Sequence, residues 1–266
     1  MNTPETMRHV LTKVPEVTVL FWIIKVLTTG MGETTSDFLV KSINPVIAVG
    51  LGAIGLVIAL ALQFRARRYV PWIYWLTVIM VAIFGTMAAD VLHIGLGIPY
   101  LVSTLFFLIS LAIVFALWYV SEKTLSIHSI YTKRREIFYW VTVMTTFALG
   151  TAAGDMTATT MHLGYLASGV MFGVLIAIVA LGHFITLNIL QKEHRHQSRN
   201  AVFAFWFAYI LTRPLGASFA DWMGVSTIRG GLAWGTGPVS LVLFILIVCL
   251  VAYLTIRHKD GFERKV

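Results

Sequence analysis

Long apolar runs alternate with short polar segments along the whole chain. A run of about twenty apolar residues predicts a helix that crosses the membrane, because a helix rises about 1.5 Å per residue and the hydrocarbon core is roughly 30 Å thick. The runs predict eight membrane spans, at residues 17–40, 44–64, 72–92, 99–120, 137–160, 164–190, 201–224 and 236–256.

The composition agrees with a membrane protein and excludes several other classes. Only 12% of the residues are charged and the mean hydropathy is +0.83, whereas a soluble domain carries about a quarter charged residues. The net charge is +8, but the basic residues lie in short clusters between apolar runs and form no patch for nucleic acid. The lone Cys249 excludes a disulfide framework. Because phosphate-binding loops and hydrolase motifs are absent from the sequence, we expect no enzyme and no bound cofactor.

The basic clusters predict the orientation of the spans. They follow the even-numbered spans, whereas the only basic residues of the intervening loops are Lys41 and Arg229. Because basic loops stay on the cytoplasmic side, we expect both termini there, with cytoplasmic tails at 1–16 and 258–266. The basic segments are Arg8–Lys13, Arg65–Arg68, Lys123–Arg135, Lys192–Arg199 and Arg257–Lys265.

A short motif recurs at the end of every odd-numbered span: a glycine, four mostly small residues and an aspartate. The four copies are Gly32–Asp37, Gly85–Asp90, Gly150–Asp155 and Gly216–Asp221. Each copy is followed by a short outer loop, an even-numbered span and a basic inner loop. The chain is therefore predicted to be one all-α, polytopic membrane domain of four parallel two-helix repeats, related by a pseudo-fourfold axis or by nested twofold axes. The repeats are expected at about 17–71, 72–136, 137–200 and 201–257.

The repeated segments resemble a known family. The segments KVLTTGMGETTSDFL, TFALGTAAGDM and RPLGASFADW are similar to those of bacterial integral membrane proteins built from a tandem repeat of unknown function. The resemblance covers essentially all four repeats, and its most specific part is the glycine-to-aspartate spacing. It implies a multi-pass protein of the bacterial inner membrane, and it implies no activity.

Charged residues inside the predicted spans are the main candidates for function. An ionisable group at membrane depth costs roughly 2.5–3.5 kcal/mol on insertion scales, so such groups pair with each other or line a hydrated path. Acidic residues outnumber basic ones, and the excess calls for a cation unless some carboxyls are protonated. The four motif aspartates are expected to form a ring around one axis. Capping of a neighbouring helix, contact with interfacial water, and a proton relay without metal remain open. The acidic residues are Glu33, Asp37, Asp90, Asp155 and Asp221, and the basic ones are Lys25 and Arg213.

Ligand chemistry favours a divalent metal ion at this ring. Glu33 lies four residues before Asp37, on the same helical face, among hydroxyl-bearing residues. Oxygen-rich surroundings suit Mg²⁺, Mn²⁺ or Ca²⁺, and the nearby His93 and His162 would shift the preference towards Mn²⁺, Zn²⁺, Co²⁺ or Ni²⁺. Both histidines are also compatible with outer loops at the headgroup level.

Several roles are open to Lys25 and Arg213. They are candidates for counter-charges that an entering cation displaces, for an anion-selective inner vestibule, or for structural ion pairs that lock repeats one and four together. A Schiff base on Lys25 is a further alternative.

Taken together, the sequence favours a transporter for a divalent cation, proton- or sodium-coupled, with the lipid bilayer and a metal cation or proton as its partners. Two rivals remain: a scaffold or sensor whose buried charges are structural ion pairs, and an intramembrane enzyme using an aspartate pair. Whether the protein forms a homo-oligomer is left open.

Overall fold

Helices make up the regular structure of the described part of the chain. The computed structural model describes residues 12–189 and 194–263, and the side chains of 12–186 and 200–257. The long helices of this part are α2 (Val19–Ser42), α3 (Pro45–Arg65), α4 (Pro71–Asp90), α5 (Tyr100–Glu122), α6 (Lys133–Asp155), α7 (Gly164–Ile189), α8 (His194–Gly224) and α9 (Thr236–Glu263). Two short π-helices, η1 (Val91–Gly95) and η3 (Met156–Thr160), extend α4 and α6, and η2 (Ile127–Ser129) and η4 (Thr227–Arg229) are single 3₁₀ turns. The predicted all-α fold is confirmed.

Helix starts follow from local side-chain chemistry. The Thr18 hydroxyl accepts a hydrogen bond from the Phe21 amide at 3.2 Å, and the Asn44 side chain caps α3 in the same way. Pro45 and Pro71 occupy the first turns of α3 and α4, where no amide hydrogen is needed. Lys123 ends α5 in the left-handed conformation.

Within the described residues, seven helices are long and apolar enough to cross a membrane, so the protein is a multi-pass membrane protein. These are the helices that correspond to the second to eighth predicted spans. The helix at the first predicted span, α2, is more polar and does not qualify by composition within the described residues. Its charged residues are Lys25, Glu33, Asp37 and Lys41.

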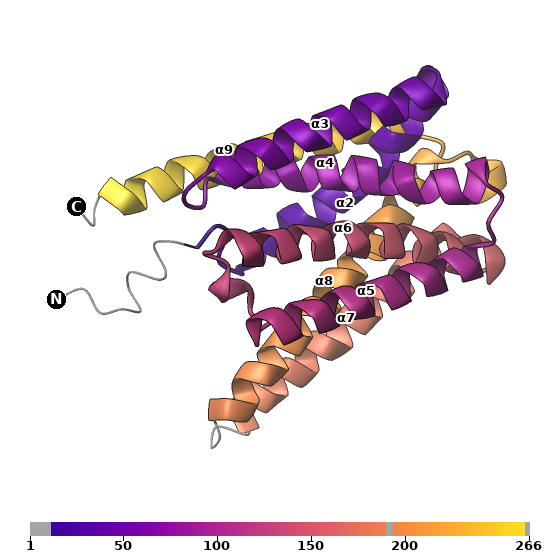
Figure 1. Ribbon diagram of the computed structural model, residues 1–266. Helices are drawn as coiled ribbons and strands as arrows, with labels where there is room; N and C mark the ends of the chain where they lie inside the picture. Colours follow the sequence, from indigo (N-terminus) through magenta and orange to yellow (C-terminus); the bar gives the residue numbers. More distant parts are fainter. Residues whose placement is uncertain (1–11, 190–193, 264–266) are drawn as a thin grey trace.

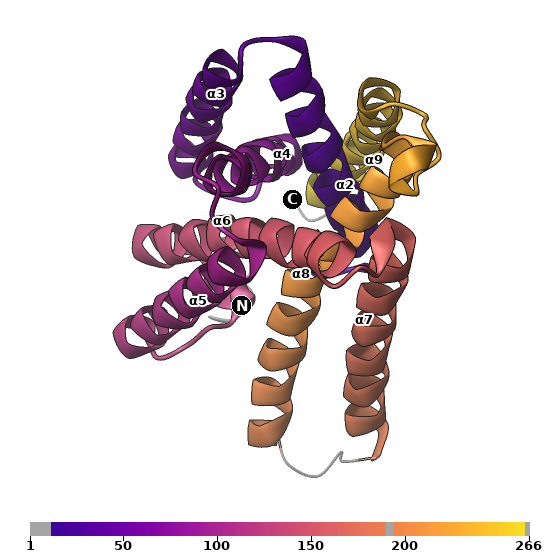
Figure 2. The ribbon, with the colours of Figure 1, turned by 90° about the vertical axis from the view of Figure 1, so that its right-hand side faces the viewer.

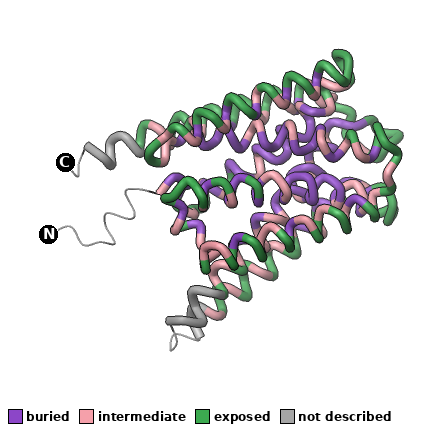
Figure 3. Tube along the Cα trace, in the orientation of Figure 1, coloured by how far each residue is buried: buried purple, intermediate pink, exposed green. Residues whose placement is uncertain are grey.

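Four helices form a closed ring at the centre of the molecule. Helix α2 packs against α4, α4 against α6, α6 against α8, and α8 against α2 (Figure 2). In α4, α6 and α8, 44–67% of the most apolar stretch is buried, whereas the value is 11–22% for α3, α5, α7 and α9. Figure 3 shows the same division, with buried residues along the central helices and exposed ones on the outer helices. The ring helices are those that carry the glycine-to-aspartate motifs.

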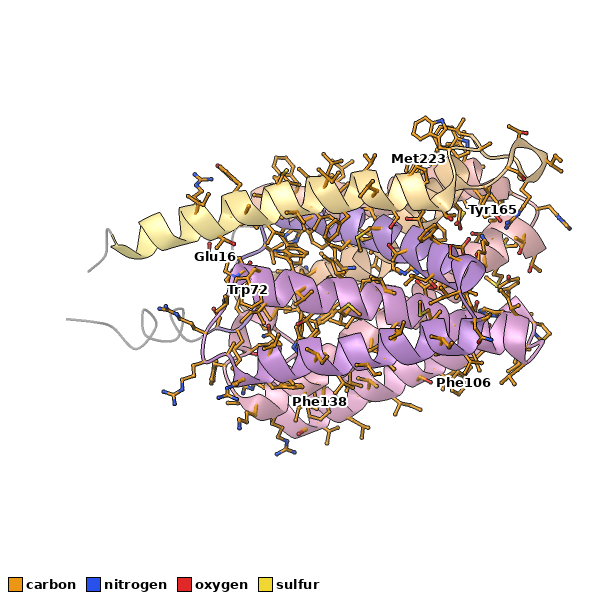
Figure 4. The ribbon with its side chains drawn as sticks, turned by 90° about the horizontal axis from the view of Figure 1, so that it is seen from above. Glu16, Trp72, Phe106, Phe138, Tyr165 and Met223 are labelled. Atoms are coloured by element: carbon orange, nitrogen blue, oxygen red, sulfur yellow. The ribbon has the colours of Figure 1, made fainter. Side chains whose placement is uncertain are left out.

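The outer helices connect successive repeats. Each packs mainly on the ring helix of the following repeat: α3 on α4, α5 on α6, and α7 on α8. Helix α9 of the last repeat packs on α2 of the first, so the chain closes on itself. Helix α2 begins and α9 ends at the same end of the bundle (Figure 1). We call this the inner end and the opposite one the outer end; Trp72 lies at the inner end and Tyr165 at the outer end in Figure 4.

Candidate functional site

The four motif glycines are the points at which neighbouring ring helices meet. A Cβ added to any of them would lie within 2.9 Å of an atom of the next ring helix, closer than a real Cβ contact. Small residues permit such close approach of helices. Gly216, in the last repeat, contacts the first repeat and closes the circle. The nearest contacts include Ala82 for Gly32, Phe147 for Gly85, Arg213 for Gly150, and Val26 and Thr29 for Gly216.

An aromatic layer closes the ring nearer the inner end. Each repeat carries a phenylalanine or tyrosine eleven residues before its motif glycine, followed directly by a tryptophan. The first aromatic ring of each repeat packs on the tryptophan of the next. The centroid distances are 5.7 Å for Phe21–Trp75, 5.6 Å for Tyr74–Trp140, 6.1 Å for Tyr139–Trp206 and 5.6 Å for Phe205–Trp22. This layer was not predicted, although an aromatic–tryptophan pair recurs at a fixed distance before each motif glycine and could have indicated it.

The guanidinium of Arg213 joins all four repeats. Arg213 is fully buried, and its Nη2 shares its two hydrogens among three acceptors: Glu33 at 2.6 Å, the Thr151 hydroxyl at 2.7 Å and the Thr86 hydroxyl. Its Nη1 donates to the Thr29 carbonyl at 3.3 Å. Glu33, Thr86 and Thr151 each directly follow a motif glycine, so they are equivalent positions of repeats one to three. Arg213 and Glu33 form an ion pair between repeats four and one, which was one of the roles left open for Arg213, but neither Glu33 nor the two threonines were predicted as its partners.

Lys25 lies deeper towards the inner end and has no acidic partner. Its side chain is buried, and Nζ makes no hydrogen bond within the described part of the chain. The amine lies over two aromatic rings, 4.2 Å from the centroid of Phe147 and 4.3 Å from that of Tyr209. Arg213 lies over the same Phe147 ring at 5.6 Å. The structure therefore contains no ion pair of Lys25 with any described acid.

The motif aspartates gather at the outer end, and three of them lack a direct partner. Asp37 pairs with Lys41 on its own helix and is partly exposed. The side-chain carboxylates of Asp90, Asp155 and Asp221 make no hydrogen bond or ion pair with the residues the structure describes. All three lie close enough to Glu33 and Asp37 for their charges to interact. Arg213 and Arg229 also act on this cluster from a distance, and its carboxylates outnumber these cations.

Two of these aspartates lie where an α-helix changes to a π-helix. Asp90 ends α4 directly before the π-helix η1, and Asp155 ends α6 directly before η3. Neither side chain caps the segment that follows, so the capping interpretation does not hold for these two. π-Helical turns inside longer helices are frequent at functional sites.

The two candidate histidines do not approach the aspartates by hydrogen bonds. His93 is buried; its Nδ1 lies 3.3 Å from the Ser103 hydroxyl, and its ring packs on Tyr100 at 4.3 Å. His162 is exposed and has a φ of 56°. Among the described residues, no three His, Cys, Asp or Glu side chains converge in a way that could hold a metal ion as they stand.

The inner end carries a second buried ion pair that the sequence did not suggest. Lys13 donates to Glu136 at 2.6 Å, and Gln63 donates to the other oxygen of Glu136 at 3.0 Å. The Lys13 amide also donates to the Ile130 carbonyl at 3.0 Å. Residues 12–16, which we expected in a tail, are therefore partly packed against the inner loops, while residues 1–11 and the side chains of 258–266 lie outside the described part.

The fold and the site define a class: a multi-pass membrane protein of four tandem repeats around one ring of helices. The family model described as "Repeat of Unknown Function (DUF347)" matches residues 20–69, 73–124, 138–187 and 204–260. These matches cover most of the chain, so the protein belongs to this family, and the predicted resemblance and the four internal repeats are confirmed. Neither the curated proteins nor the solved structures contain a match to the chain.

Proposed function

We propose that the protein is a membrane transporter for a divalent metal cation, with the motif aspartates as its outer binding ring. The observation that carries the proposal is the set of three aspartates that share one end of the ring and lack direct partners. Because like charges at short range repel and are costly in a medium of low dielectric constant, such a cluster favours a bound cation. Rings of carboxylates of this kind select cations in pores.

Arg213 and Glu33 act as the closed gate in this proposal. The guanidinium lies where equivalent residues of three repeats meet, directly below the acidic end. An entering cation that binds Glu33 would release Arg213 from its only carboxylate partner among the described residues. The threonine hydroxyls at positions 86 and 151 would then keep part of the guanidinium satisfied. The aromatic layer closes the path nearer the inner end.

The same proposal includes the architecture around the site. All eight long helices cross the membrane, with α2 shielded by the ring in spite of its charges, and the four repeats are parallel and related by a pseudo-fourfold axis. The circle of glycine contacts and the circle of aromatic contacts support this symmetry. The basic inner loops support cytoplasmic termini in a bacterial inner membrane.

A divalent metal is favoured over a monovalent ion by the number of acids. The structure has no three-ligand group in its described residues, so the carboxylates must close around the ion when it binds. Asp90 and Asp155 precede π-helical turns, and such turns are places where a helix end can adjust.

The rival function is a scaffold in which the charges only join repeats. One observation favours it: Arg213 holds groups from all four repeats in one network. A scaffold depends on that network and not on the unpartnered aspartates. The two functions therefore differ in which substitutions cause loss of assembly.

The test is metal-dependent stability and metal uptake by the purified full-length protein. Mn²⁺, Zn²⁺, Co²⁺, Ni²⁺, Ca²⁺ and Na⁺ are screened by thermal unfolding, and the stabilising ion is then followed into proteoliposomes. An ion at a hundred times its dissociation constant adds about 2.7 kcal/mol to the stability of the folded state. We expect stabilisation by a divalent ion and uptake of the same ion.

Three variants decide between the functions. Asp90→Asn, Asp155→Asn and Asp221→Asn are expected to assemble like the wild type while each loses metal stabilisation and uptake. If no ion stabilises the wild type, and only substitutions at Arg213 or Glu33 have an effect, namely loss of assembly, then the scaffold is correct and the transporter is not.

A further inference from the structure

Lys25 is a buried lysine that has no role in the proposed gate. Its amine lies over two aromatic rings, at a repeat position that is apolar in two of the other three repeats. The equivalent positions, seven residues before each motif glycine, are Val78, Val143 and Tyr209. Packing therefore does not require a lysine here, because two repeats fill the same position with valine.

The charge of Lys25 is not balanced by any neighbour. A buried ammonium group is normally paired or hydrogen-bonded, because an unpaired one loses its hydration without compensation. The one charged side chain of the described residues that acts on Lys25 is Arg213, which repels a positive amine. Two aromatic faces offset part of this cost, since a cation over a ring is stabilised by up to about 2 kcal/mol when desolvated.

The titratable groups around Lys25 come from all the ring helices. Helix α8 contributes Tyr209 at the amine and Arg213 over the same Phe147 ring; one contact further, through Trp206, lie Tyr139 of α6 and then Tyr74 of α4. The nearest carboxylate along α2 is Glu33, which is bound to Arg213. None of these groups supplies a negative partner to the amine, so its protonation depends on its distance from Arg213 and on access of water.

We propose that Lys25 is a proton-binding site, loaded and unloaded in step with the movement of Arg213. With Arg213 held by Glu33, the amine accepts a proton and is stabilised by the two aromatic faces. When a cation takes Glu33, the freed guanidinium, which shares the Phe147 ring with Lys25, repels the ammonium more strongly. The ammonium then loses one proton to water and becomes a neutral amine, so one positive charge leaves while the divalent ion brings in two.

In this proposal the proton passes through the aromatic layer, which lies nearer the inner end than Lys25. The hydroxyls of Tyr74 and Tyr139 lie 2.5 Å apart within the aromatic layer, between Lys25 and the inner end. Hydroxyl pairs donate and accept at once, so they relay a proton without holding a charge. The exchange of a proton for a metal cation would make the transporter an antiporter.

The coupling part of this inference rests on the proposed transport, whereas the proton site itself does not. The first test therefore follows the amine directly. Full-length protein carrying lysine labelled with ¹³C at the ε-carbon is titrated from pH 5 to 11, and the carbon shift reports whether each amine is charged. The Lys25 signal is assigned by its absence in Lys25→Met and, independently, in Lys25→Arg.

We expect the Lys25 signal to move at a lower pH than the signals of exposed lysines, because the amine is buried, has no acidic partner and shares the Phe147 ring with Arg213. A solvent-exposed lysine in general keeps its ammonium until roughly pH 10.4, and the signals of exposed lysines serve as the internal reference. A Lys25 signal that titrates together with these exposed lysines identifies a permanent structural cation and overturns the proton site. A signal that stays at the neutral position over the whole range overturns it as well.

The second test measures coupling as proton release. Mn²⁺ is added to weakly buffered protein with a pH indicator, and we expect wild type to release one proton more per bound ion than Lys25→Met. Lys133→Met is the matched control and releases as many protons as wild type. Equal release by Lys25→Met and wild type overturns the coupling. If Mn²⁺ does not bind at all, the proposed transport fails for this ion, while the ¹³C titration still decides whether Lys25 binds a proton.

Discussion

The two layers at opposite ends of the helix ring are built from the same repeat and differ in how their members contact each other. In the aromatic layer each residue packs on the tryptophan of the next repeat, in a circle without a gap. In the aspartate layer no member bonds to another, and three have no direct partner among the described residues. One sequence pattern therefore produces a closed layer and an open one.

The aromatic layer is suited to stabilise the bundle, and the aspartate layer is suited to bind a ligand. Contacts between large aromatic rings stabilise the bundle by burial and by ring geometry, and they leave nothing for a ligand to bind. Unpartnered carboxylates do the opposite, because their mutual repulsion opposes folding until a cation compensates it. If this comparison is correct, substitutions in the aromatic layer lower stability and substitutions in the aspartate layer lower cation binding.

The largest effect is expected for Trp75→Ala. Trp75 is fully buried and contacts Phe21 of the preceding repeat as well as Tyr74. Removing a buried tryptophan side chain costs about 3–5 kcal/mol, because the transfer free energy is lost and a cavity remains. Thermal or denaturant unfolding in detergent measures the loss. Trp72→Ala is the matched control, since Trp72 is 48% exposed at the same end of the bundle, and a similar loss in both variants would contradict a special role for the layer.

Much of the fold was predictable from the alternation of apolar runs and charged segments. Each predicted span corresponds to one long helix, because a run of apolar residues of that length has few other ways to satisfy its backbone groups. The glycine-to-aspartate motif located the ring helices and the four repeats. A structural ion pair between repeats four and one was one of the roles left open for Arg213, but Glu33 was not predicted to be its partner.

The rest depended on which helices are neighbours, and a single sequence does not specify this. The threonine partners of Arg213, at positions 86 and 151, act only because repeats two and three lie within reach of repeat four. The packing of each outer helix on the following repeat likewise needs the order of helices around the ring. The ion pair of Lys13 with Glu136 joins residues 123 positions apart, so no local sequence pattern could predict it.

An intermediate effect is expected for Gly150→Val. This glycine lies against Arg213 and Pro214, between the closed layer and the open one. Overpacking at such a contact costs about 1–3 kcal/mol, since the neighbouring helix must shift. The same unfolding measurement applies. Gly182→Val in α7 is the control, because nothing lies within 4 Å of an added Cβ there, and its effect should stay within about 0.5 kcal/mol.

The smallest effect on stability is expected for Asp155→Asn. Asparagine has nearly the same shape, and Asp155 makes no hydrogen bond or ion pair with the described residues that the change could remove. Stability without added metal should therefore change by less than about 0.5 kcal/mol. Because one repelling charge is removed, we expect this change to be a small increase in stability. Thermal unfolding with and without the stabilising ion measures both properties in one experiment.

Asp37→Asn is the matched comparison for this aspartate, because it changes the one motif aspartate whose carboxylate has a partner. Its pair with Lys41, one helical turn away and partly exposed, contributes about 0.3–0.5 kcal/mol. Without metal, Asp37→Asn should thus be slightly less stable than wild type and Asp155→Asn should not. A clear loss of stability in Asp155→Asn without metal would mean that Asp155 has a structural partner, and the outer layer would then be as closed as the aromatic one.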